Sequence, residues 1–145
     1  MGITSEIPVG ESFDLAGRTV GLERETGRAV FVARTPGQPP NRIVGYTVQA
    51  SPVDGPPPHG GEMHPDADEL LYLISGQVRV SLELADGGRE VGLSAGQAMV
   101  VPRGTWHQIH VDEPGQLLNI TPGPGGQARP PNGDVIDRPG PPVVP

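Results

Sequence analysis

Two short segments of the sequence hold side chains that could bind a metal ion or transfer a proton. In the first, Glu62 and His64 are two residues apart, so on an extended chain their side chains share one face. Glu69 follows after four turn-prone residues, which can bring its carboxylate back toward the same point. In the second, His107 comes just after the turn at 102–104. If these faces converge, two imidazoles and two carboxylates would suit a divalent ion such as Mn, Fe, Co, Ni or Zn.

The absence of cysteine narrows the chemistry that the chain can do. It excludes disulfides, thiolate nucleophiles, iron–sulfur clusters and cysteine zinc sites, so histidine, carboxylate or water must hold any metal. Of the two other histidines, His59 lies in a proline-rich loop and is expected at the rim of the site. It could complete the site in place of Glu62 if that loop folds inward. His110 is three residues from His107, so on a strand it faces away and is expected at the surface.

The elements that must position these residues are β-strands. The sequence has no long stretch with apolar residues at helical spacing and a cap at its start. Short β-prone segments bounded by turn residues recur instead, and such strands pair antiparallel in a closed barrel or jelly roll. We expect strands at 19–22, 29–33, 43–50, 69–74, 78–84, 89–93, 97–101, 105–111 and 116–121.

The length of 145 residues fits one ordinary domain. The expected barrel covers residues 1–121, including N-terminal strands, and its chemistry-bearing part covers 56–121. The 22 glycines and 19 prolines mostly sit between apolar runs, as turn residues do. Only residues 122–145 are so rich in Pro and Gly that they predict an irregular tail.

Charge and hydropathy exclude two classes of partner. The formal net charge is −7, no basic cluster exists and aromatic residues make up only 3%, so nucleic acid is not an expected partner. No apolar run is long enough to span a bilayer, so a membrane is not expected either. Residues 1–10 have no basic start followed by an apolar stretch, which predicts a cytoplasmic location.

The first segment resembles the first sequence motif of the cupin superfamily. That motif contains His-x-His, three or four residues, Glu, six residues and Gly. Here Glu62 and His64 stand at the His-x-His positions, and Glu69 and Gly76 follow at the motif's spacing. Glu62 replaces the usual first histidine, which puts a carboxylate where the family has an imidazole.

The second segment resembles the second cupin motif, which runs Gly, five residues, Pro-x-Gly, two residues, His, three residues, Asn. Gly96, Pro102, Gly104 and His107 match it at each spacing, and Val111 replaces the final Asn. Since that Asn is not usually a ligand, the resemblance implies a metal site of Glu62 with the two histidines and Glu69.

The resemblance also implies a function. It indicates a small metal-dependent enzyme that acts on a small organic molecule in the barrel, of the dioxygenase, isomerase, cyclase or lyase type. Two histidines and a carboxylate leave open coordination positions, as non-haem iron oxygenases require. Glu62 or Glu69 could take a proton from the substrate. The alternative is a non-catalytic small-molecule binder or sensor. Small cupins are commonly homodimers, and the N-terminal β-segments could pair with a partner's sheet edge.

Overall fold

The computed structural model describes residues 4–33 and 43–131, which form ten β-strands and contain no helix. The pairing is antiparallel throughout, which confirms the expected all-β class. In this described part, no helix is long and apolar enough to cross a membrane. The strands are β1 (Thr4–Glu6), β2 (Thr19–Glu23), β3 (Ala29–Val32), β4 (Gly45–Val53), β5 (Glu62–Met63), β6 (Glu69–Leu84), β7 (Gly87–Ser94), β8 (Ala98–Val101), β9 (Trp106–Gly123) and β10 (Gln127–Ala128).

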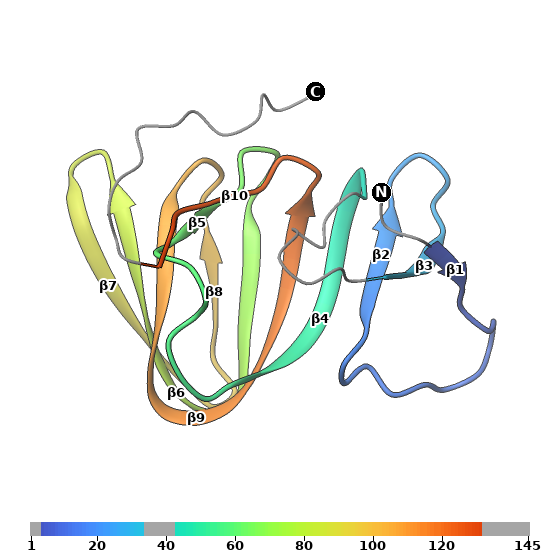
Figure 1. Ribbon diagram of the computed structural model, residues 1–145, viewed down its shortest axis with the longest axis horizontal. Helices are drawn as coiled ribbons and strands as arrows, with labels where there is room; N and C mark the ends of the chain where they lie inside the picture. Colours follow the sequence, from blue (N-terminus) through green and yellow to red (C-terminus); the bar gives the residue numbers. More distant parts are fainter. Residues whose placement is uncertain (1–3, 34–42, 132–145) are drawn as a thin grey trace.

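Strands β6 and β9 form the frame of the molecule. They are the longest strands, they pair with each other, and both curve around the barrel (Figure 1). In one half, β8 joins β6 and β4 joins β9, with β2, β3 and β1 beyond β4. In the other half, β7 joins β6, while β5 and β10 follow the start of β9. This wrap is the antiparallel barrel of jelly-roll type that the strand and turn pattern predicts.

Where the sequence predicts two turns, the structure has bends in continuous strands. Residues 69–74 and 78–84 are one strand, β6, and residues 105–111 and 116–121 are one strand, β9. The pairing register shifts between Leu73 and Val78, so the chain there forms β-bulges at Ile74 and Gly76 rather than a turn. Gly76 has φ +87°, and a Cβ there would lie 2.5 Å from the carbonyl oxygen of Glu113. The same small residues that indicate turns therefore let two strands bend together at close range.

Alternate residues of β6 point into the barrel and are buried. Leu71, Leu73 and Val80 face inward and are 1% exposed or less, as the period-two pattern requires. They join one apolar core with Val78, Leu82, Leu93, Val101 and Leu117. Glu69 continues the same inward row and is equally buried. A charged group at such a position needs compensation from partners.

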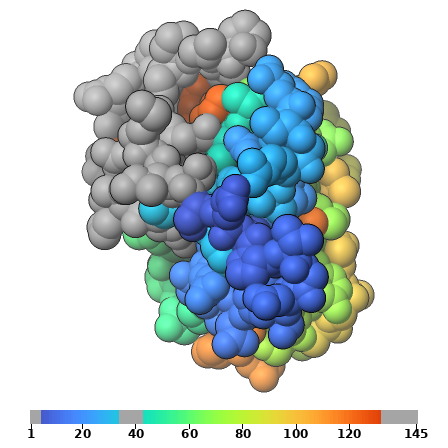
Figure 2. Space-filling view, turned by 90° about the vertical axis from the view of Figure 1, so that its right-hand side faces the viewer, coloured from blue at the N-terminus to red at the C-terminus, as the bar shows by residue number. Residues whose placement is uncertain are grey.

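The N-terminal strands β1, β2 and β3 form one end of the sheet, beyond β4. β2 and β3 confirm the strands expected at 19–22 and 29–33, and β1 adds to β3. Figure 2 shows these strands, in blue, gathered on one side of the molecule. The rings of Phe13 and Phe31 meet edge to face with centroids 5.1 Å apart, and the guanidinium of Arg18 lies 4.9 Å above Phe31. These contacts hold the loop before β2 onto β3.

The first part of the expected irregular tail is paired with the barrel. Strand β9 runs to Gly123, past the boundary expected after residue 121, and β10 pairs with β5. A short strand in a Pro- and Gly-rich segment has no periodic signal, so the sequence does not reveal it. The domain boundary itself stays a prediction, and residues 132–145 of the expected tail lie outside the described residues.

Candidate metal centre

Four side chains from three strands and one connecting loop converge inside the barrel. Glu62 opens β5, and the β5–β9 pairing sets it opposite His107. His64 follows β5, and Glu69 opens β6 after the turn-rich connection. One ligand atom from each of these residues lies within 4.8 Å of all the others. The structure thus brings together all four side chains that the sequence selects.

The distances among the four groups suit a shared cation. His107 Nε2 lies 3.0 Å from Glu69 Oε1 and 3.5 Å from Glu62 Oε1. His64 Nε2 lies 3.4 Å from Glu69 Oε2 and 3.8 Å from Glu62 Oε1. Both imidazoles therefore direct Nε2 toward the carboxylates. Ligand atoms around one divalent ion at about 2.0–2.2 Å are separated by distances of this order.

Several buried atoms of this cluster lack hydrogen-bond partners among the described residues. His64 Nε2, His107 Nε2 and Glu69 Oε1 have none among the described residues, although each is inaccessible to solvent. Buried polar groups are normally hydrogen-bonded, and orphaned ones indicate an ion or water in the site. The donor set of two imidazoles and two carboxylates fits a divalent metal.

The other ring nitrogen of His107 fixes the state of this imidazole. Nδ1 lies 3.1 Å from the carbonyl oxygen of Thr105, which can only accept. Nδ1 therefore carries the proton and donates it to that carbonyl, which leaves the Nε2 lone pair toward the cluster in the neutral ring. This is how backbone carbonyls commonly orient a ligating histidine.

In the metal-free cluster, the neighbouring groups shift the pKa values of Glu62 and His107. Burial raises the pKa of Glu62, but the His107 and His64 imidazoles outweigh it and hold the pKa well below its usual range. Burial lowers the pKa of His107, but Glu62 and Glu69 more than offset it and raise the pKa to about 10. The cluster is thus an environment that favours positive charge between its carboxylates.

Glu62, rather than His59, supplies the fourth group. His59 lies at the rim, where its Nε2 is 3.6 Å from Glu62 Oε2, and it is not part of the four-residue cluster. The amide of Gly61 donates to His59 Nδ1 over 3.1 Å, so in the neutral ring the proton is on Nε2 and points toward Glu62. The loop thus brings His59 next to Glu62 Oε2 but not into the cluster.

His110 faces away from the cluster, as its spacing from His107 predicts, but it is half-buried rather than at the surface. His110 Nε2 lies 3.1 Å from Ser81 Oγ. The sequence misses two supporting residues. Thr121 donates a hydrogen bond of 2.7 Å to Glu69 Oε2, and Thr105 holds His107. Thr105 lies two residues from His107, which is a weak local signal. Thr121 is 52 residues from Glu69, so only the strand register reveals the contact.

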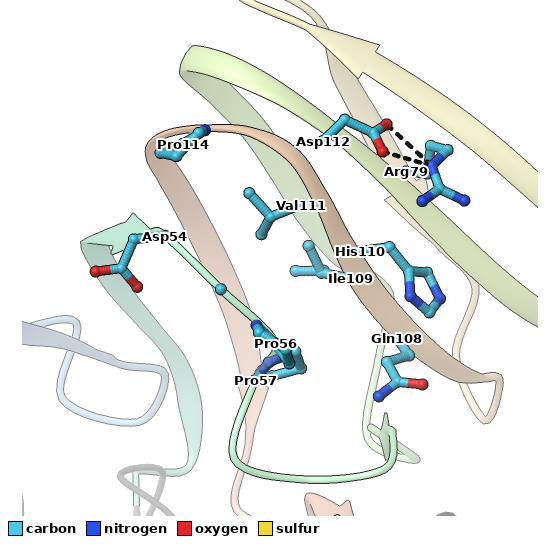
Figure 3. A pocket seen from close by; sticks show the side chains of 11 residues that line it. Asp54, Pro56, Pro57, Arg79, Gln108, Ile109, His110, Val111, Asp112 and Pro114 are labelled. Atoms are coloured by element: carbon cyan, nitrogen blue, oxygen red, sulfur yellow. Dashed lines mark hydrogen bonds and ion pairs between the residues drawn. The ribbon is translucent and has the colours of Figure 1, made fainter.

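A separate hollow of about 450 Å³ lies between β9 and the loop after β4 (Figure 3). Pro56 and Pro57 of that loop lie across from Ile109 and Val111 (Figure 3). Arg79 also lines it, tied to Asp112 by hydrogen bonds from Nε to both carboxylate oxygens, at 3.0 and 2.9 Å. None of the four cluster residues lines this hollow.

The fold and the cluster define a class: an antiparallel jelly-roll barrel with histidine and carboxylate side chains gathered inside it. Residues 53–121 match the family model described as a cupin domain. This part of the chain is thus a cupin domain, as the two motifs indicate.

Solved structures share the fold at low sequence identity. A variant of oxalate decarboxylase from Bacillus subtilis matches with a TM-score of 0.51 and 24% identity, over 58% of this chain and 24% of that one. A hydroquinone 1,2-dioxygenase in complex with Cd²⁺ and 4-hydroxybenzonitrile matches with a TM-score of 0.46 and 22% identity, over 56% and 60%. The corresponding enzyme from Sphingomonas sp. TTNP3 has a TM-score of 0.45 and 16% identity, over 57% and 64%.

The chain thus spans less than two thirds of each of these proteins. The likeness to the oxalate decarboxylase supports the fold alone. No curated protein matches the sequence.

Proposed function

We propose that this protein is a metal-dependent cupin enzyme that acts on a small organic molecule inside the barrel. In this proposal Glu62, His64, Glu69 and His107 hold one divalent ion of Fe, Mn, Ni, Co or Zn. The observation that carries the proposal is the convergence of these four groups with orphaned buried atoms directed at one point. When bound, the ion would supply a Lewis acid or a redox centre with open coordination positions.

The two carboxylates differ in their surroundings, which divides their roles. Glu69 is 1% exposed and its Oε2 accepts from Thr121, so it is suited to hold the ion in place. The Glu62 side chain is 30% exposed, and its Oε2 faces the rim and His59. Glu62 is therefore the carboxylate that a substrate can reach, and it is the candidate to take a proton from the substrate. Dioxygenase, isomerase, cyclase and lyase reactions are all compatible with this arrangement.

Elemental analysis of protein purified without added metal tests the proposal. We expect close to one divalent ion per chain in the wild type. His107→Ala should lose most of the ion, because it removes a buried imidazole that contacts both carboxylates. Ser94→Ala, an exposed change on β7, is the matched control and should retain it. Wild-type protein that takes up no divalent ion would overturn the proposal.

Activity separates the enzyme from its alternative. Turnover of a small organic substrate should rise in proportion to bound metal. Tight binding of a small molecule to the metal-loaded protein without turnover would assign the non-catalytic binder or sensor instead. A homodimer and a cytoplasmic location belong to the same proposal and stay predictions.

A further inference from the structure

A chain of hydrogen bonds runs from the wall of the barrel to the most buried ligand of the candidate centre. The side-chain amide of Asn119 donates from Nδ2 to Thr121 Oγ1 over 3.0 Å. The hydroxyl of Thr121 donates in turn to Glu69 Oε2 over 2.7 Å. Both residues are on β9, directly beside the start of β6, because Leu70 pairs with Ile120.

The direction of these bonds is set by chemistry. An ionised carboxylate can only accept, so the single hydroxyl proton of Thr121 must point at Glu69. The oxygen of Thr121 can then only accept from Asn119, which requires the NH₂ group of that amide to face it. Each bond in the chain therefore fixes the next, and the hydroxyl has no second orientation that satisfies both neighbours.

The outcome at Glu69 is a carboxylate with two different oxygens. Oε2 is occupied by Thr121, whereas Oε1 has no hydrogen-bond partner among the described residues and lies 3.0 Å from His107 Nε2. Glu69 is 1% exposed and Thr121 is 8% exposed, so water does not compete freely for this contact. Charge-assisted hydrogen bonds of this length are among the strong ones.

We infer that Thr121, supported by Asn119, is a positioning residue that orients the Glu69 carboxylate toward the metal. This inference rests on the proposed function and extends it to residues outside both sequence motifs. Partners that orient a ligand in this way commonly contribute 10- to 100-fold to metal affinity. Without the hydroxyl, the Glu69 carboxylate can rotate about its last side-chain bond and present its oxygens differently to the ion.

Substitution of Thr121 tests this role with a metal probe. Thr121→Val keeps the shape of the side chain and removes the hydroxyl, whereas Thr121→Ser keeps a hydroxyl at the same position. Co²⁺ affinity is measured by competition with a chelator, and the visible spectrum of the Co²⁺-loaded protein reports ligand geometry. We expect Thr121→Val to lower the affinity roughly 10- to 100-fold and to shift the spectrum. Thr121→Ser should remain within about threefold of wild type, with an unchanged spectrum, because the same donor is present.

Thr47→Val is the matched control. Thr47 is 3% exposed and pairs with Thr121 across β4 and β9. Its hydroxyl donates to the backbone carbonyl of Thr121 over 3.4 Å and does not reach Glu69. Thr47→Val therefore makes a similar change in the same wall, and its Co²⁺ affinity and spectrum should stay near wild type.

The results separate this inference from the function it rests on. If the wild type binds Co²⁺ and Thr121→Val binds it equally well with the same spectrum, the positioning role is wrong and the metal centre stands. Equal losses in Thr121→Val and Thr47→Val would also overturn it, since they would reflect general disruption of the wall.

If Thr121→Val does not fold, Asn119→Ala removes only the supporting donor and should produce a smaller spectral shift in the same direction. An unchanged spectrum in Asn119→Ala would then contradict the inference. Wild-type protein that binds no metal would overturn both.

Discussion

At the residue scale, Glu62 is the feature that sets this candidate centre apart from the motif it resembles. Two carboxylates and two neutral imidazoles cancel the charge of a divalent ion, whereas the motif's extra histidine would leave a net positive charge. The Glu62 side chain is also 30% exposed, and its outer oxygen is 3.6 Å from His59 Nε2. Glu62 can therefore be a ligand, a base, or both.

Replacing Glu62 by Gln should separate these roles. The change keeps the size of the side chain and removes its charge. If Glu62 is a ligand, metal affinity should fall by at least about tenfold, because a charged ligand at the ion is lost. If Glu62 serves only as a base, Glu62→Gln should keep its metal and lose turnover. Metal stoichiometry and turnover are the measurements.

His59→Ala is the control for that experiment. It removes the rim imidazole and leaves all four cluster residues in place, so metal content should stay near wild type. Loss of metal in His59→Ala together with normal metal and turnover in Glu62→Gln would reverse the assignment of the fourth group.

The pH dependence of stability tests the electrostatics of the metal-free cluster. The pKa of His107 is raised from 6.5 to about 10, so between these values the folded protein holds a proton that the unfolded chain releases. This stabilisation is fully present below about pH 6.5 and is lost as the pH rises through about 10. The melting temperature of chelator-treated protein should therefore fall across this window, as measured by circular dichroism. In His107→Gln the fall should be smaller, and a wild-type melting temperature that rises toward pH 10 would contradict the assignment.

The spacing of four residues predicted the candidate centre, but the sequence did not reveal the residues that contact these four side chains. Glu62, His64, Glu69 and His107 are recognisable because short motifs carry them on local turns. Thr121 reaches Glu69 only through the register of β6 and β9, and two strands that pair at long range carry no local signal for that register. The contact between Thr121 and Glu69 is therefore found from the structure.

At the scale of elements, β6 and β9 bend at the same place. Each of these two strands therefore takes part in both halves of the barrel. A Cβ at Gly115 would overlap the carbonyl oxygen of Ser75. Small residues here predicted turns because Gly and Ser favour turns and bulges alike. The sequence thus located the change of direction and mistook its type, since the outcome depends on a neighbouring strand that bends at the same place.

Gly115→Ala should test whether this close approach is essential. The added methyl group must displace backbone, so we expect a loss of at least about 2 kcal/mol in unfolding free energy. Gly92→Ala on β7 is the control, because nothing lies within 4 Å of its Cβ position. That change should stay within about 0.5 kcal/mol of wild type. Chemical denaturation measures both, and equal stabilities would show that the bend relaxes at low cost.

Strand β5 carries Glu62 but has only two residues, so neighbouring segments must hold it. Arg129 does so through its backbone: its amide donates to the Gly61 carbonyl over 2.8 Å, and its carbonyl accepts from Gly60 over 2.9 Å. Its guanidinium lies 4.1 Å above the ring of Trp106 and pairs with Glu83. The segment after β9 thus holds β5 against the barrel.

Arg129→Ala should loosen that fastening without touching a ligand. Loss of the Trp106 contact and of the ion pair should cost about 0.5–2 kcal/mol of stability. We expect metal affinity to fall a few-fold, because β5 would fray more often. Arg28→Ala, which removes an exposed pair with Glu6 on the N-terminal strands, should leave metal affinity unchanged. Equal affinity in both variants would show that β5 is held without Arg129.

At the scale of the whole molecule, one outer face of the barrel is apolar. Alternate residues of β6 point outward there, opposite the buried Leu71 and Leu73. Strand pairing joins two rows across this face: Val100, Leu70, Ile120, Val48 and Val20 in one, and Ala98, Tyr72, Leu118 and Ala50 in the other. Six of the large apolar side chains that remain exposed are Leu22, Val44, Leu70, Tyr72, Ile74 and Val100.

This face is where we predict the homodimer to form. Neither row contains a charged residue, so two chains that each carry a net charge of −7 can meet there without bringing like charges into direct contact. Tyr72 is 36% exposed and lies within the apolar area, so Tyr72→Glu should bury a charge in the contact and shift the protein to a monomer. Ser94→Glu adds the same charge on β7, in the other half of the barrel, and should leave the assembly intact.

Light scattering over a range of concentrations distinguishes the outcomes. A dimer that persists in Tyr72→Glu would move the interface elsewhere, with the exposed edge at β1 the next surface to test, and a monomeric wild type would end the prediction.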